Sequence, residues 1–259
     1  MRAERTIVTL SSIAVAIFLV GCTHAVQTTS GINYLASFPE AVKSDQDFEA
    51  KLRAAANVEP LLRFPARIGL ARIGHNHCRA MLLSPSAEEG KAWLELADSL
   101  GPDYGEFVPI SPLVAAMVAP TPPACWGSDS ARDVVGTVRL AAARQHIDVV
   151  MIYEVDATAN ARRNPLSIAN WTVIGAFVVP SQNLKAQGVA QAMLVDVRNG
   201  YPYGTIKATA DDKAMSALIR SWEAEKDLTK RVETAAVKNL AQEARDLMRE
   251  LKQDLAARD

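Results

Sequence analysis

The chain has 259 residues and a formal net charge of −1, with 22% charged and 49% hydrophobic residues. This length suits one domain with an appendage, and the apolar fraction excludes a disordered chain because it can supply a sizeable core. The near-neutral charge gives no electrostatic basis for nucleic-acid binding, and three cysteines are too few for a disulfide-dense scaffold.

Residues 1–21 are typical of a secretory signal peptide. Arg2 and Arg5 give a positive start, and the apolar stretch from 7 to 20 is too short to span a bilayer comfortably as a helix. It ends in Leu-Val-Gly-Cys at 19–22, which resembles the lipobox of bacterial lipoproteins. The resemblance implies cleavage before Cys22, whose thiol would then carry a diacylglyceryl group. The alternative is an ordinary signal peptide or a short anchor with a chance cysteine.

The lipobox also implies a destination. Two or three acyl chains hold a lipoprotein firmly in a membrane, so the membrane is the first expected partner. Thr23 follows the cysteine, where an aspartate typically retains lipoproteins in the inner membrane. We therefore expect the periplasmic face of the outer membrane, with the inner membrane as the alternative. The polar residues up to 44 are predicted to form a lipidated tether, 22–44.

Residues 45–210 are predicted to form an α/β or α+β domain with a mixed sheet of about five strands layered with helices. Helices are expected at 45–57, 86–100 and 130–146, and the second begins with a capping box of Ser86 and Glu89. Six prolines make 101–127 mostly loop, with a short strand near 107–110. The other strands are expected at 67–73, 148–155, 171–179, 188–198 and 203–209. The run at 148–155 is almost entirely apolar, which is typical of a strand covered on both faces.

Residues 211–259 are predicted to form a long, charged C-terminal helical segment. Of these 49 residues 21 are charged, and an apolar stripe runs from Met215 to Leu255. A polar run at 223–227 leaves one helix and two helices equally open. We expect the first half to cover the sheet, and the second half either to do the same or to project as a coiled coil. We therefore expect this helix to bind a protein partner or to mediate self-association. We also expect the sheet domain to fold without residues 230–259.

Cys78 and Cys125 are the only cysteines left after lipidation. Because the periplasm is oxidising and both residues lie near predicted loops, we expect an intramolecular disulfide between them. Two free thiols or an intermolecular bridge are the alternatives.

Chemistry-bearing residues are few. The cluster of His75, His77 and Cys78 has the right donors for zinc or copper. His75 and His77 would point the same way on a strand, but no further well-placed ligand is visible elsewhere in the sequence, so we expect neither a metal nor a cofactor. Glu154 and Asp156 share one face of a predicted strand, in the manner of a carboxylate pair, although acids at strand ends are commonly solvated. The acids nearest to predicted strands are Asp148, Glu154, Asp156 and Asp196.

The segments 170–177 and 192–198, with Tyr34-Leu35 and the strands at 68–71 and 148–151, resemble rhombotarget-type lipoproteins over roughly residues 31–210. Members of that family end in a glycine-rich sorting tail. This chain ends in a charged helix, so processing by a rhomboid-type protease is not implied. The family supplies no established activity.

A looser likeness is to curli-secretion-channel lipoproteins, which assemble rather than catalyse. Their pore needs membrane-spanning hairpins, and the predicted connection at 181–187 is too short for one. The sequence therefore favours an outer-membrane-anchored periplasmic lipoprotein with a non-catalytic binding or envelope-assembly role. The alternative is a periplasmic, hydrolase-like enzyme that uses Glu154, Asp156 or the histidine cluster.

Overall fold

A computed structural model describes residues 23–36, 46–76, 79–119, 130–163, 182–216 and 221–258. The elements in chain order are β1 (Thr23–Val26), α1 (Gly31–Ala36), α2 (Gln46–Ala56), β2 (Ala66–Asn76), β3 (Arg79–Leu83), α3 (Ala87–Leu100), the 3₁₀ turn η1 (Pro102–Tyr104), β4 (Gly105–Pro109), α4 (Pro112–Val118), α5 (Ser130–Arg144), β5 (Val149–Arg163), β6 (Gln182–Asp196), β7 (Pro202–Ser216) and α7 (Ser221–Ala256). The α/β class and the long C-terminal helix are confirmed.

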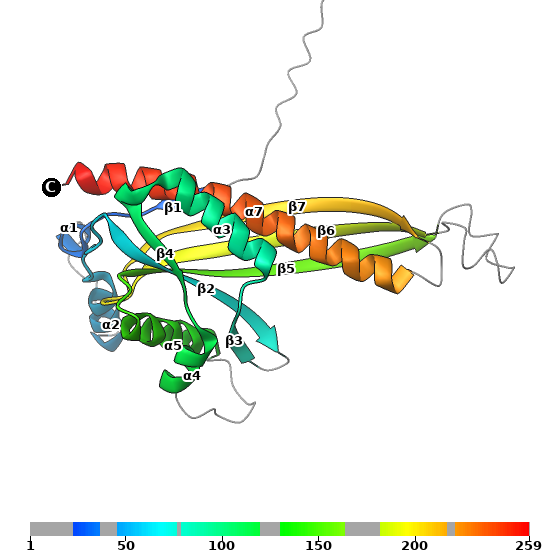
Figure 1. Cartoon of the computed structure of the whole chain (residues 1–259). Helices are drawn as coiled ribbons and strands as arrows, with labels where there is room; N and C mark the ends of the chain where they lie inside the picture. The colour runs from blue at the N-terminus through cyan, green and yellow to red at the C-terminus, as the bar shows by residue number, and fades with distance from the viewer. Residues whose placement is uncertain are drawn as a thin grey trace, which may run out of the picture.

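One mixed sheet organises the molecule (Figure 1). Seven described strands form it in the order β1-β7-β6-β5-β2-β3, and β4 pairs with β2 beside β3. The contacts of β2 with β4 and β5 are parallel, whereas β5, β6 and β7 form an antiparallel meander. Helices separate most of the strands that precede β5, but β2 and β3 follow each other as an antiparallel pair, and β3 was not predicted from the sequence. β7 follows β6 through a short turn, as expected.

Helices cover both faces of this sheet. On one face α3 and α7 pack against Val149, Met151 and Tyr153 of β5. On the other face α4 and α5 pack against Val150 and Ile152 of the same strand. The first half of β5 is therefore the doubly covered strand expected from its apolar run. The predicted capping box of α3 is also present, with Glu89 N–H donating to Ser86 Oγ at 3.2 Å.

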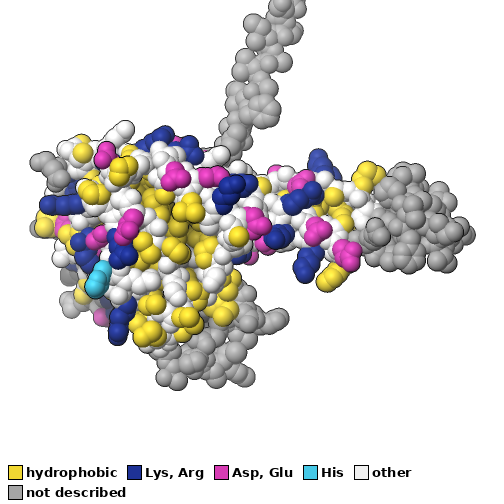
Figure 2. Space-filling view, viewed as in Figure 1, with side chains coloured by type: hydrophobic (Ala, Val, Ile, Leu, Met, Phe, Trp, Pro, Cys, Tyr) yellow, Lys and Arg dark blue, Asp and Glu magenta, His cyan; other side chains and the backbone are white. Residues whose placement is uncertain are grey.

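The second halves of β5 and β7 and the first part of β6 extend beyond the rest of the sheet (Figure 1). We call this extension the arm: residues 154–163, 182–191 and 208–216, together with the first turns of α7 at 221–232. Figure 2 shows it protruding from the body of the molecule, with acidic and basic side chains interspersed along it. A small core of Leu184, Ala186, Leu228 and Val232 joins the strands of the arm to α7.

A glycine allows the helix to approach this part of the sheet closely. A Cβ atom on Gly188 of β6 would lie 2.7 Å from the carbonyl oxygen of Val232 in α7. Any side chain at this position would push the helix away from the strands.

The segment expected to be a tether, 22–44, carries structure close to Cys22. Its residues 23–26 form β1, which pairs antiparallel with β7, Thr23 lying opposite Lys207. Residues 31–36 form α1, where Ile32 N–H donates to a carboxylate oxygen of Glu59 at 3.0 Å. These short elements depend on contacts with distant residues, which the local sequence does not display.

The C-terminal helix covers the sheet, as expected, but it begins later than predicted. Residues 211–216 continue β7, and a single helix runs from Ser221 through the polar 223–227 run. Its second half, expected to cover the sheet or project, is deeply buried: Leu247, Met248 and Leu251 are fully enclosed in the main core. The first half covers the strands of the arm, which belong to the same sheet, as expected.

Other differences concern strand length. β5, β6 and β7 each have fifteen residues, so 182–187, expected as a connection, belong to β6. α4 occupies a stretch predicted to be loop, because Ser111 caps it and Pro112 fits its first turn. The strand predicted at 171–179 lies outside the described residues.

Candidate functional site

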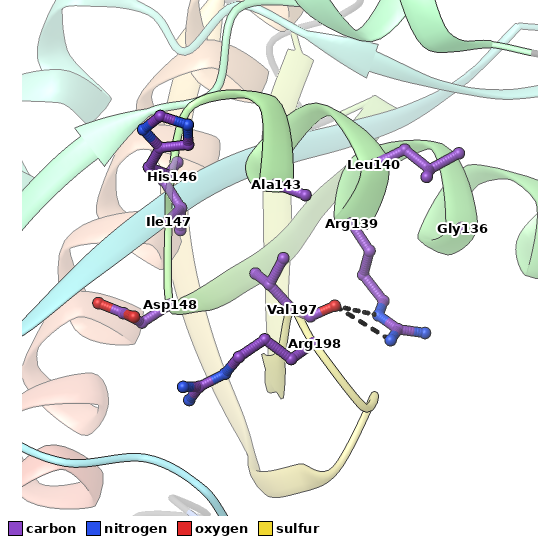
Figure 3. Close-up of a pocket in the computed structure, with 9 residues that line it drawn as sticks. All are labelled: Gly136, Arg139, Leu140, Ala143, His146, Ile147, Asp148, Val197 and Arg198. Atoms are coloured by element: carbon purple, nitrogen blue, oxygen red, sulfur yellow. Dashed lines mark hydrogen bonds between the residues drawn. The ribbon is translucent and has the colours of Figure 1, made fainter.

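A pocket of about 700 Å³ opens where α5 ends and β5 begins (Figure 3). Its lining residues are Gly136, Arg139, Leu140, Ala143, His146, Ile147, Asp148, Val197 and Arg198. They come from α5, from the turn into β5 and from the turn between β6 and β7. Neither turn stands out in the sequence as a site.

The α5–β5 turn is shaped by His146. Its backbone has φ 54°, in the left-handed region, which ends the helix and directs Ile147 into the core beneath α5. Ile147 N–H still donates to the carbonyl of Ala142 at 3.0 Å. The His146 ring consequently lies on the far side of the pocket from the two arginines (Figure 3).

Arg139 joins α5 to the β6–β7 turn. Its Nε and Nη2 donate to the carbonyl oxygen of Val197 at 3.3 and 3.1 Å (Figure 3). Gly200, with φ 79°, allows this close approach, because a Cβ there would lie 2.9 Å from Arg139 Nη1. Arg139 therefore has a structural role on one side of the pocket.

Asp148 is also engaged in holding the backbone. Its Oδ2 accepts a hydrogen bond of 2.9 Å from the N–H of Arg67, and Arg67 Nη1 donates to the carbonyl of Gln145 at 2.8 Å. The carboxylate and its neighbours thus fix the register at which β2 meets the α5–β5 turn.

Arg198 connects the pocket to a buried polar network. It donates to both carboxylate oxygens of the fully buried Asp196, through Nε at 3.3 Å and Nη2 at 3.2 Å. These hydrogen bonds raise the pKa of Arg198 above its usual range. Arg198 Nη2 also donates to the carbonyl of Leu61 at 3.2 Å. Guanidinium groups only donate hydrogen bonds, so neither arginine is suited to acid–base catalysis, and both already bind protein groups.

Of the acids singled out in the sequence, Asp148 lines this pocket and Asp196 contacts its residue Arg198, whereas Glu154 and Asp156 lie elsewhere. Glu154 and Asp156 lie within β5 rather than at its end, as the strand continues to Arg163. Glu154 accepts a hydrogen bond from the amide of Gln191 on β6, and Asp156 is exposed. The backbone of His75 pairs with Ala80 of β3, beyond the point where β2 leaves β5.

The four remaining candidates, Cys22, His77, Cys78 and Cys125, lie outside the described residues. Within the described ranges no group of three or more His, Cys, Asp or Glu side chains is placed to hold a metal ion. None of the helices in the described part of the chain is long and apolar enough to cross a membrane.

Comparison with known proteins gives weak likenesses. No protein-family description and no curated protein matches this chain. Among solved structures, a single-substitution variant of the PelC dodecamer from Paraburkholderia phytofirmans is similar over 71% of this chain and 91% of that chain, with 14% identity and a TM-score of 0.32. The hypothetical protein CT253 from Chlamydia trachomatis is similar over 73% and 94%, with 10% identity and a TM-score of 0.24. These values are too low to support a statement about activity or assembly.

Proposed function

We propose that this protein is a lipid-anchored, non-catalytic binding protein on the periplasmic face of the outer membrane, and that the arm is its binding surface. The observation that carries the proposal is the arm itself. A strand of fifteen residues measures about 50 Å at 3.3 Å per residue, well over twice the length of an average strand.

The composition of the arm favours a binding role. One face of its sheet is covered by α7 through small residues such as Ala157, Ala159 and Ala186. The opposite face carries polar side chains, including exposed Thr158 on β5, Lys185 and Gln187 on β6, and neighbours of both charges. A projecting sheet with long free edges adds little core, so a function outside the fold explains its retention better than stability does.

The position of Cys22 supports membrane attachment close to the sheet. β1 begins at Thr23 and is held on β7, with His24 Nε2 2.8 Å from a carboxylate oxygen of Glu250 on α7. Because Cys22 directly precedes β1 in the sequence, an acyl group on Cys22 would hold the sheet next to the membrane.

The anchor is tested by replacing Cys22. We expect Cys22→Ser to lose incorporation of labelled palmitate and to release the protein from membranes into the periplasm. Cys125→Ser is the matched control, and it should keep both the label and the membrane fraction. Palmitate that still enters the Cys22→Ser variant would overturn the lipoprotein proposal.

The binding role of the arm is tested by site-specific photocrosslinking in cells. A photoreactive residue at Lys185, in the centre of the polar face, should give a discrete crosslinked product. The same residue at Leu94, which is 63% exposed on α3 of the body, is the control and should give none. Equal crosslinking at both positions, or none at Lys185, would contradict the assignment of the arm.

A further inference from the structure

Among the described strands, none pairs with one edge of the outer half of β5, which we call its free edge. β2 pairs with β5 from Ile68 opposite Val149 to Arg72 opposite Tyr153. Beyond Arg72, β2 continues with β3 paired on its other edge. From Glu154 onward, β5 has β6 on one side and no strand of the described residues on the other. Figure 1 shows β2 and β3 turning away from the arm at this point. The free edge is ten residues long, from 154 to 163.

Charges are ordered along this edge. Glu154 and Asp156 lie near the body, whereas Arg162 lies near the tip, and all three project from the face of the arm opposite α7. Thr158 and Asn160 lie between them on that face and are exposed. The α7-facing positions of the same edge are Val155, Ala157, Ala159 and Ala161. An edge that begins with acids and ends with a base is complementary to itself when two copies run antiparallel.

We propose that the β5 edge is an interface with a second copy of this chain, the two edges pairing antiparallel about a twofold axis at Thr158. In this register Glu154 of each copy faces Arg162 of the other, and Asp156 faces Asn160. Side chains directly opposite each other in an antiparallel pair lie on the same face, so the small α7-facing residues also meet, Ala157 against Ala159. The pairing joins the two arms into a sheet of six strands.

The observations favour this occupant and orientation. The paired stretch, 154–162, fits the free edge and ends where β2 begins to occupy β5 in each copy. Parallel pairing in register would place Glu154 beside Glu154 and Arg162 beside Arg162, which is repulsive. The free edge of β7, at 208–216, has adjacent acids at Asp211 and Asp212, and Asp212 is already 3.2 Å from Arg231 of α7. The interface is separate from the C-terminal helix and does not depend on the lipid anchor.

A disulfide placed at the axis tests the geometry. In the full chain purified in detergent, Thr158→Cys should give a covalent dimer on mild oxidation, because Cα atoms opposite each other in an antiparallel pair lie within disulfide range. Peptide mass spectrometry should find position 158 joined to position 158. Gln187→Cys is the matched control: it lies opposite Thr158 on β6 and on the same face, but one strand away from the edge. Equal crosslinking of both variants, or none at 158, would overturn the proposal.

Charge reversal tests the register by sedimentation or light scattering. Arg162→Glu and Glu154→Arg should each weaken self-association about tenfold or more, because each dimer loses two attractive pairs and gains two repulsive ones. The double variant should restore association, and Lys185→Glu, with the same change of charge on β6, should leave it unchanged. All these positions lie in the arm outside its core, and circular dichroism verifies that each variant is folded. A monomeric parent chain at high concentration, or a double variant that stays as weak as the single ones, would contradict the pairing.

Discussion

The hydroxyl of Tyr203 donates a hydrogen bond of 2.9 Å to the buried carboxylate of Asp196 and accepts two more from the N–H groups of Leu61 and Leu62, at 2.9 and 2.7 Å. Burial, together with the charge of Asp196, raises the pKa of Tyr203. One phenol thus joins the end of β6 to the segment that leads into β2. Asn199 adds a second tie nearby, donating to the carbonyl of Glu59 at 2.6 Å.

We predict that Tyr203→Phe lowers the free energy of unfolding by about 3 kcal/mol. The substitution leaves two backbone donors and a buried carboxylate short of a partner, and each unsatisfied buried group costs about 1–3 kcal/mol. Urea denaturation followed by circular dichroism measures the change. Tyr104→Phe is the control, since the Tyr104 ring packs against Phe64 near the surface, and its effect should stay below about 0.5 kcal/mol. Equal effects in both variants would show that the network contributes nothing.

The ion pair between Arg72 and Glu89 gives a second prediction. Glu89 is only 3% exposed, lies 3.0 Å from Arg72, and accepts a hydrogen bond of 3.2 Å from the hydroxyl of Tyr153. Removing one partner of a buried pair costs about 3–5 kcal/mol, because it leaves an uncompensated charge. We expect this loss from Arg72→Met, and partial recovery when Glu89→Gln is added. Thermal unfolding of the two single variants and the double variant measures the coupling, with Lys91→Met on the exposed side of α3 as control. Strictly additive effects of the two substitutions would contradict the coupling between Arg72 and Glu89.

The stability should depend on pH through Glu233. Burial of this side chain on α7 raises its pKa above the ordinary 4.5, with Glu89 and Asp156 contributing and Arg72 opposing. The folded state therefore binds the proton more tightly than the unfolded state, so the contribution of Glu233 to stability is fully present below about pH 4.5 and is lost as the pH rises through the folded pKa. Glu233→Gln should remove this fall and raise stability at pH 7 by a few tenths of a kcal/mol. Denaturation midpoints of the parent chain and of Glu233→Gln at pH 4 and pH 7 test this prediction, and an equal fall in both proteins would contradict it.

The burial of α7 reverses the expectation that the sheet domain folds without residues 230–259. Deletion of these residues should abolish cooperative thermal unfolding, because it removes Leu240, Leu247 and Leu251 from the main core. Leu247→Ala should by itself cost about 2–5 kcal/mol, the usual range for a buried leucine. Leu94→Ala, at an exposed position on α3, should cost far less. A truncated chain that still melts cooperatively would show that the helix is dispensable.

The disulfide between Cys78 and Cys125 stays a prediction, because both residues lie outside the described part of the chain. The flanking elements support it: Ala80 and Leu82 of β3, directly after Cys78, pack with residues of α4 and α5, the helices on either side of Cys125. Mass spectrometry of non-reduced peptides from periplasmically expressed protein should find the two cysteines joined. Alkylation of both thiols in the native protein would exclude the bond.

The predictable parts of the fold are those where local pattern and packing agree. The capping box at Ser86 and the 3.6-residue period after it predicted α3. The apolar run after Asp148 predicted the half of β5 that is covered on both faces. The arm was not predicted because most of its residues that face α7 are alanines and glycines. In the alternation from Asp156 to Arg162 these small residues are only weakly hydrophobic, so the pattern of a strand is hard to recognise. That alternation of small and polar residues is nevertheless the period of a strand with one covered face.

The candidate pocket could not be predicted for a different reason. Asp148 is one of the acids beside predicted strands, but Arg139 and Arg198 are ordinary charged residues in two other segments. Only the meeting of α5 with the β6–β7 turn brings the three together. The two acids that did attract attention, Glu154 and Asp156, belong to the solvent-facing side of the arm. The sequence shows which residues are charged, but the contacts between distant segments decide on which part of the sheet each one lies.

The continuity of α7 has a mechanical consequence. At 1.5 Å per residue, its 36 residues make a rod of about 54 Å, one end of which is set in the main core by Met248 while the other supports the arm at Leu228. The helix stiffens the three strands that it crosses. A force applied near the tip of the arm is therefore transmitted to the body and does not bend the arm locally. Rigidity of the arm is therefore inseparable from the integrity of the body: loosening the helix at Met248 should soften a surface several turns away.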